Sequence, residues 1–175
     1  MTTLTGFTVL VLLVGLERLA ELVVSKRNAA WAFDRGGRET GQGHYPAMVV
    51  LHSGLLAGAL LEAWLTRPQV PPVLAWTMLL LVLVSQGLRW WCIATLGRAW
   101  NTRVIVVPGA PRVRRGPYRW LPHPNYVAVV LEGAALPLVH AAWLTALVFT
   151  VLNAALLTVR LRVESSALRL LGDAA

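Results

Sequence analysis

Long apolar stretches constrain this chain more than any other feature. Residues 4–24, 46–65 and 73–96 each approach the roughly 20 residues that a helix needs to cross a bilayer, and residues 126–159 suffice for two crossings. Backbone amides find no water in the hydrocarbon core, so only helices or closed barrels span it. Hydrophobic residues make up 57% of the 175, above the usual share for a soluble domain. We therefore predict an all-α polytopic membrane protein, with residues 1–175 forming one integral-membrane domain.

The fourth apolar stretch is interrupted by the sequence Pro-Leu-Val-His at residues 137–140. A proline inside a helix removes a backbone donor and clashes with the preceding turn. One continuous helix over residues 126–159 would also be about 50 Å long, which overshoots the bilayer. We predict a helical hairpin here, and so about five transmembrane helices in all, with one continuous kinked helix as the alternative.

Positive charge is distributed unevenly between these stretches. The chain carries 16 Lys+Arg against 8 Asp+Glu, a net charge of +8. Four of the basic residues fall in residues 26–38 and six in residues 98–119, whereas Arg67 stands alone on the opposite side. The positive-inside rule then places the amino terminus outside and the carboxyl terminus in the cytoplasm. The pattern favours a membrane protein and gives no reason to expect a nucleic-acid partner. Residues 4–24 lack a basic n-region and a clear cleavage site, so we expect a retained span rather than a signal peptide.

Several ionisable residues lie inside the apolar stretches, where an unpaired charge is costly. Glu17, Arg18 and Glu21 are expected to pair with neighbours or to reach the interface. Arg89, followed by two tryptophans, is typical of an interfacial anchor, and its alternative role is to approach a bound anion. Glu132 is either a functional acid or the hydrogen-bonded partner of an arginine or a tyrosine.

The chain between the third and fourth stretches contains two unusual segments. Residues 100–111 read WNTRVIVVPGAP, a short β-prone run closed by proline and glycine. Residues 116–126 read GPYRWLPHPNY, in which Pro122 and Pro124 hold the backbone extended around His123 before a helix begins. The free amides of a helix amino terminus can bind a ligand's carboxylate, so this segment is a candidate site. A plain connecting loop is the alternative.

The last apolar stretch ends in Arg160-Leu-Arg-Val-Glu164. Arg160 and Glu164 are four residues apart and share one face of a helix, so a simple ion pair would explain them. They are predicted to lie on the same side of the membrane as His123, however, and titratable groups gathered in one place are typical of a functional site.

Together these residues resemble the isoprenylcysteine carboxyl methyltransferase family, in particular its bacterial integral-membrane members. The resemblance covers a methyltransferase-like region at residues 97–168, and the Leu-Glu-Arg-Leu-Ala-Glu-Leu sequence of the first stretch is similar too. The matching positions are Gly116, Pro117, Tyr118, His123, Pro124, Tyr126, Arg160, Glu164 and Leu168.

The resemblance implies an S-adenosylmethionine-dependent O-methyltransferase with a cytoplasmic cofactor pocket and no metal. The residues that would hold the cofactor are Val106, Val107, Gly109, Tyr118, His123, Asn125, Tyr126 and Glu164. The backbone of the first three would face the adenosine, and the His-Pro-Asn-Tyr segment would face the amino-acid end. Arg160 and Glu164 would be the catalytic pair, with Arg160 facing the acceptor.

By the same resemblance, the acceptor would be a lipophilic small molecule with a carboxylate, phenol or enol oxygen, such as a long-chain polyketide or an isoprenoid lipid. The protein would lie in the bacterial inner membrane, among membrane lipids. Pro122 and Ser165 replace an arginine and a glutamate that are usual in the family, and Arg119 or Arg115 could supply the missing cation. An NADPH-dependent enzyme like the membrane sterol reductases and a noncatalytic membrane adaptor remain the alternative functions.

Overall fold

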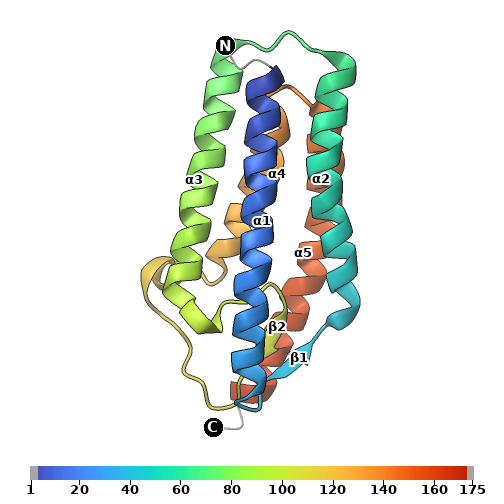
Figure 1. The fold of residues 1–175 in the computed structure, drawn as a ribbon. Coiled ribbons are helices and arrows are strands. Elements are labelled where there is room, and N and C mark those ends of the chain that lie inside the picture. The colour runs from blue at the N-terminus through green and yellow to red at the C-terminus, as the bar shows by residue number, and fades with distance from the viewer. Residues whose placement is uncertain (1–3, 173–175) are drawn as a thin grey trace.

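A computed structural model describes residues 4–172, with side chains described up to residue 167. Its described part contains five α-helices that stand side by side as one bundle (Figure 1). They are α1 (Leu4–Phe33), α2 (Tyr45–Thr66), α3 (Pro72–Leu96), α4 (Pro124–Leu138) and α5 (Trp143–Gly172). Helix α1 begins at one end of the bundle, and α5 finishes at the opposite end. The short elements gather at the end where α5 finishes.

The short elements are two strands and three 3₁₀ turns: β1 (Arg38–Thr40), η1 (Gln42–His44), η2 (Gly97–Ala99), β2 (Val104–Val106) and η3 (Gly116–Arg119). Strand β2 lies within the predicted β-prone run and pairs antiparallel with β1, so that Glu39 stands opposite Ile105. The fold is therefore helical with one small sheet, whose first strand the sequence pattern did not reveal.

The predicted apolar stretches agree with the helices except at the end of the first and of the last one. The last stretch was predicted to finish at residue 159, but α5 continues to Gly172. Helices α2 and α3 match within a residue, and residues 139–142 separate α4 from α5, with Pro137 in the last turn of α4. The first stretch was predicted to finish at residue 24, but α1 continues to Phe33. The extension follows from the absence of proline and glycine in residues 25–35, because exposed basic residues do not end a helix.

Three segments are long and apolar enough to cross a membrane: Gln42–Thr66, Pro72–Ala99 and Trp143–Ala167. Large apolar side chains such as Leu65, Val73 and Leu144 point outward, and many of the buried residues between the helices are alanines. Outward-facing leucine and valine with small residues inside is the pattern of helices that pack in lipid. The chain is an integral membrane protein.

The interior changes character from one end of the bundle to the other. Near the start of α1 it is apolar, built around Phe7, Val11 and Leu136. In the middle of the bundle it becomes ionic. Arg89 of α3 donates to Glu132 of α4 at 2.8 Å, and Arg18 of α1 donates to Glu21 at 2.8 Å.

Cross-contacts join these two pairs into one network of ion pairs. Arg18 lies 3.4 Å from Glu132, and Arg89 lies 3.7 Å from Glu21. Glu17 adds hydrogen bonds from Gln86 and Trp90 of α3. Glu17 and Glu21 of α1 thus pair with neighbouring side chains, as predicted. Of the two roles considered for Glu132, the structure shows the hydrogen-bonded partner of an arginine.

The prediction that Arg89 is an interfacial anchor was wrong. Its side chain is buried, with 6% of the residue exposed, because it faces α1 and α4 across the bundle. Trp90 and Trp91 follow it on the exposed side of α3. An arginine and the tryptophans beside it on a helix point about 100° and 200° apart, so only the tryptophans reach the lipid-facing surface.

Candidate functional site

A cavity of about 620 Å³ opens at the end of the bundle that carries the sheet. Its walls come from α1, the end of α3, the segment after η2, η3, the start of α4, and α5. The structure brings all the predicted site residues to this one cavity: Val106, Val107, Gly109, Tyr118, His123, Asn125, Tyr126, Arg160 and Glu164.

The Tyr126 hydroxyl is the centre of the polar contacts in this cavity. It accepts a hydrogen bond from Nε of Arg160 at 2.9 Å and donates one to Oε2 of Glu164. The guanidinium of Arg160 also lies 5.5 Å from the centre of the Tyr126 ring. Within the described residues Arg160 and Glu164 form no direct ion pair, so the simple pair considered from their spacing is replaced by a bridge through a tyrosine from another helix.

His123 completes this cluster from the residue just before α4. Its ring stacks on the Tyr126 ring at 5.4 Å between centroids and 14° between planes. Its Nδ1 lies 3.6 Å from Oε1 of Glu164, so the carboxylate has one oxygen toward each ring. The prediction of an extended backbone at His123 was wrong: its φ of −136° and ψ of 62° lie outside the extended region, and its ring lies over Tyr126 in the first turn of α4.

Arg160 has a weakly bound nitrogen. Its Nη1 donates to the Sδ of Met48 in α2 at 2.7 Å, and a thioether is a poor acceptor. An oxygen anion entering the cavity would be a much better partner for this nitrogen than sulfur. The guanidinium is thus held by Tyr126 on one side and is available on the other.

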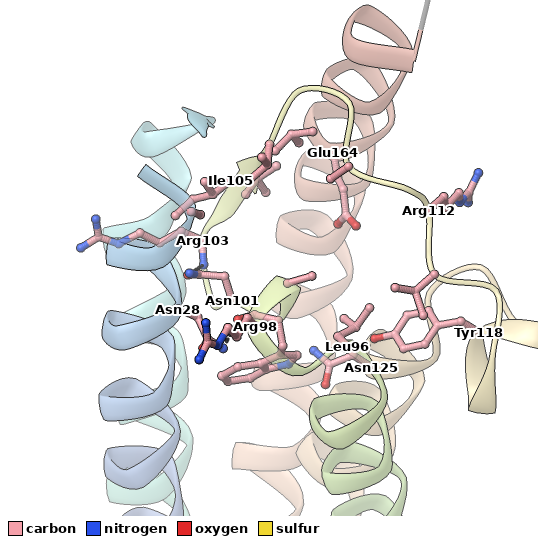
Figure 2. A pocket seen from close by; sticks show the side chains of 18 of the residues that line it. Asn28, Leu96, Arg98, Asn101, Arg103, Ile105, Arg112, Tyr118, Asn125 and Glu164 are labelled. Atoms are coloured by element: carbon pink, nitrogen blue, oxygen red, sulfur yellow. Dashed lines mark hydrogen bonds between the residues drawn. The ribbon is translucent and has the colours of Figure 1, made fainter. Parts of the chain in front are cut away.

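The amino terminus of α4 has unused polar groups. No side chain caps it among the described residues, and Oδ1 of Asn125 is buried without a hydrogen-bond partner there. Figure 2 shows the carboxylate of Glu164 reaching from α5 toward the side where Asn125 and Tyr118 lie. A buried acceptor without a partner is costly, so this atom fits a ligand that brings a donor.

The segment after β2 supplies backbone rather than charge. Gly109 adopts a positive φ of 72° in a turn that is closed by the amide of Ala110 donating to the carbonyl of Val107 at 3.2 Å. Burial and the neighbouring Cys92 thiol raise the pKa of Tyr118 above its usual range, so its phenol stays protonated at neutral pH. Gly116 opens η3 with a φ of 55°.

Helix α1 also contributes to the cavity, which the sequence pattern did not reveal. Asn28, Trp31 and Ala32 line it because α1 continues beyond its predicted end. Asn28 donates to the carbonyls of Gly97 at 3.1 Å and Trp100 at 2.7 Å, and this fixes the segment after α3 against α1. An asparagine in the basic segment after the first apolar stretch gives no sequence signal of this role.

Charge in the cavity is strongly positive. Four arginines are among the residues that line it, Arg98, Arg103, Arg112 and Arg160, and Glu164 is the one acidic residue among them. Arg119 and Arg115, the suggested substitutes for the cation lost at Pro122, do not line the cavity. Arg115 instead donates to the carbonyl of Thr95 at 3.4 Å. Among the described residues, no group of three or more histidine, cysteine or acidic side chains is placed to hold a metal ion.

Comparison with known proteins identifies the family of this chain. The model of the isoprenylcysteine carboxyl methyltransferase family matches residues 78–170, more than half of the chain. The chain is also 37% identical, over 93% of its length and 96% of the relative's, to the uncharacterized protein YpbQ of Bacillus subtilis. No solved structure matches it. The chain therefore belongs to the isoprenylcysteine carboxyl methyltransferase family, a family of membrane methyltransferases.

Proposed function

We propose that this protein is an S-adenosylmethionine-dependent methyltransferase that methylates an oxygen of a lipophilic acceptor. The observation that carries the proposal is the cluster of Arg160, Tyr126, Glu164 and His123 on one wall of a cavity. Membership of the family supplies the reaction class. The proposed catalytic region is residues 97–168, on the cytoplasmic side.

The residues present fit this cofactor. The partnerless Oδ1 of Asn125 can accept from an ammonium group, and the uncapped amino terminus of α4 favours a carboxylate. The exposed backbone around Val107 and Gly109 offers hydrogen bonds to an adenine or a ribose. Glu164 can accept from a hydroxyl or ammonium group.

The chemistry asks the protein mainly for alignment. When bound, the cofactor supplies an electrophilic methyl group for in-line displacement. Arg160 would hold the acceptor oxygen through the nitrogen that now contacts Met48, while Tyr126 and Glu164 keep the guanidinium oriented. Holding two reactants in line and away from water can contribute several kcal/mol, roughly 7 or more in favourable cases. If the acceptor arrives as a phenol or enol, Glu164 or His123 would be the group that takes its proton.

The charge of the cavity narrows the acceptor class. Four arginines and one glutamate are among the lining residues, and this balance favours an acceptor that binds as an anion. We therefore propose a carboxylate, or a phenol or enol acidic enough to ionise, on a long-chain polyketide or an isoprenoid lipid.

We further propose a five-span topology in a bacterial inner membrane, with the amino terminus outside. Three helices qualify as spans by length and composition alone. Helix α1 carries three charged residues in its middle, but these are paired, and α4 is short, at 15 residues, but packs against both α3 and α5. The basic residues at the end that carries the cavity favour the cytoplasm for it.

Calorimetric titration of the detergent-purified protein with S-adenosylmethionine and S-adenosylhomocysteine tests the reaction class, with NADPH as the comparator. We expect micromolar binding of both sulfur compounds, which Glu164→Gln weakens about tenfold or more because a charged hydrogen-bond acceptor is lost. Glu62→Gln is the matched control, since Glu62 receives hydrogen bonds from Leu144 and Thr145 at the opposite end of the bundle. Binding of NADPH instead, or no binding by folded protein, would reject the methyltransferase proposal.

A further inference from the structure

We propose that residues 107–121, here called the arginine loop, bind anionic lipid headgroups, and that this contact holds one wall of the cavity in its binding-competent position. The first half of the proposal concerns the loop alone. The second half rests on the proposed function, because it links the lipid to affinity for the cofactor.

The arginine loop carries concentrated positive charge without internal compensation. Residues 97–131 contain six arginines and neither aspartate nor glutamate. Only Arg103, of these six, has a carboxylate partner among the described residues, at 3.4 Å from Glu39. The four arginines of the loop itself are all exposed: Arg112, Arg114, Arg115 and Arg119. So many cations close together repel one another unless anions from outside the chain lie between them.

Apolar side chains place this charge at the membrane surface rather than in open water. Trp120 is 68% exposed and Leu121 is 42% exposed, although both are large and apolar. The Trp120 ring makes an edge contact, at 5.8 Å between centroids, with Trp91 near the end of α3. Since α3 is long and apolar enough to cross a membrane, these rings lie level with its last turns, where interfacial tryptophans are found. Figure 1 shows the chain after β2 passing around the outside of α3 at this level.

The same loop forms part of the cavity wall. The residues of the loop that line the cavity are Val107, Gly109 and residues 110–113. One face of the loop therefore borders the cavity, and its other face borders the outside of the protein. Figure 2 shows Arg112 on the outer side of the loop, with its guanidinium directed away from Glu164. Between residues 107 and 114, the described backbone makes one turn hydrogen bond, from Ala110 to Val107. Because this segment has so few hydrogen bonds of its own, its position depends on its contacts with neighbouring groups, which include the lipid.

Anionic lipid explains these features better than a soluble polyanion. A nucleic acid or an acidic protein could neutralise the arginines but would leave Trp120 and Leu121 in water. A headgroup layer meets both kinds of side chain, because it offers phosphates above and acyl chains below.

Hydrogen–deuterium exchange in nanodiscs tests the lipid contact without any cofactor. We expect the amides of the arginine loop to be protected in discs with about 30 mol% phosphatidylglycerol, relative to phosphatidylcholine alone, and the protection to weaken at about 0.5 M salt. The variant R112Q/R114Q/R119Q should lose most of this protection, at least tenfold, since each arginine near an anionic surface strengthens binding about fivefold. Arg115 is left unchanged because it bonds to Thr95.

The matched control is K26Q/R27Q/R162Q, which removes three exposed cations from the same end of the bundle but outside the loop. Equal loss of protection in both variants, or no protection by phosphatidylglycerol, would overturn the proposal. So would equal protection by heparin in phosphatidylcholine discs, which would indicate a soluble polyanion.

Affinity for S-adenosylhomocysteine in the same discs tests the second half. A severalfold gain with phosphatidylglycerol, absent in R112Q/R114Q/R119Q, supports the link between lipid and cavity. Lipid protection without any S-adenosylhomocysteine binding would leave the lipid site standing and reject the methyltransferase. Binding of equal strength in both kinds of disc would reject the link alone.

Discussion

The network between α1, α3 and α4 predicts unequal effects for its members. It contains two arginines, Arg18 and Arg89, and three glutamates, so its net charge is −1 when all are ionised. Arg89→Met changes that charge to −2 and leaves Glu132 without its partner at 2.8 Å. Glu132→Gln changes it to 0 and keeps an oxygen that Arg89 can still contact. Arg89→Met should therefore be the more damaging of the two.

The magnitudes follow from burial. Both side chains are more than nine-tenths buried, and removing one member of such a pair typically costs about 3–5 kcal/mol. We expect about 3 kcal/mol for Arg89→Met, because Arg18 remains 3.4 Å from Glu132. Glu132→Gln should cost about 1–2 kcal/mol, as for a weakened hydrogen bond to a charged group. The double variant R89M/E132Q restores the net charge to −1, so we expect it to be more stable than Arg89→Met.

Reversible unfolding in mixed micelles of mild detergent and sodium dodecyl sulfate, followed by tryptophan fluorescence and circular dichroism, measures these free energies. The double-mutant cycle of Arg89→Met and Glu132→Gln should give a coupling energy of about 2 kcal/mol between the two residues. Additive losses, or an Arg89→Met protein as stable as the wild type, would refute the view that these charges stabilise one another inside the bundle.

Two further substitutions test single contacts. Tyr126→Phe removes only the hydroxyl that joins Arg160 to Glu164, so we expect the fold to survive and S-adenosylhomocysteine affinity in calorimetry to fall about tenfold; unchanged affinity would show that the bridge does not matter. Gly133→Ala places a Cβ against the Phe149 ring where α4 meets α5, and unfolding in mixed micelles should show a loss of about 1–3 kcal/mol unless the ring can move aside.

The helices could be read from the sequence because lipid imposes simple rules on length and polarity. The break after Pro137 followed from bilayer thickness together with proline chemistry, and the structure places it at residues 139–142. The end of α1 could not be read in this way. Charged residues mark where the apolar stretch finishes, but a helix can continue beyond the membrane when no proline or glycine stops it.

The candidate site was predictable where its geometry is local. The start of a helix just after His123 and the four-residue spacing of Arg160 and Glu164 depend on neighbours in the chain. Contacts between distant segments were not predictable: the pairing of β1 with β2 joins residues more than 60 apart, and Tyr126 reaches between Arg160 and Glu164 only once α4 packs on α5. The role of Arg89 was misread for the same reason, because its partners lie on two other helices.

The position of α4 links the ionic network to the cavity. Glu132 and Tyr126 lie on this one helix, whose other buried residues include small ones such as Ala128 and Ala135. The Arg89–Glu132 pair would not tolerate a shift of one turn, about 5.4 Å, so we infer that it fixes the depth of α4 and thereby the place of the Tyr126 hydroxyl. R89M/E132Q should then regain stability relative to Arg89→Met without regaining affinity for S-adenosylhomocysteine. Recovery of both together in parallel titrations would show that the network stabilises the bundle without positioning the site.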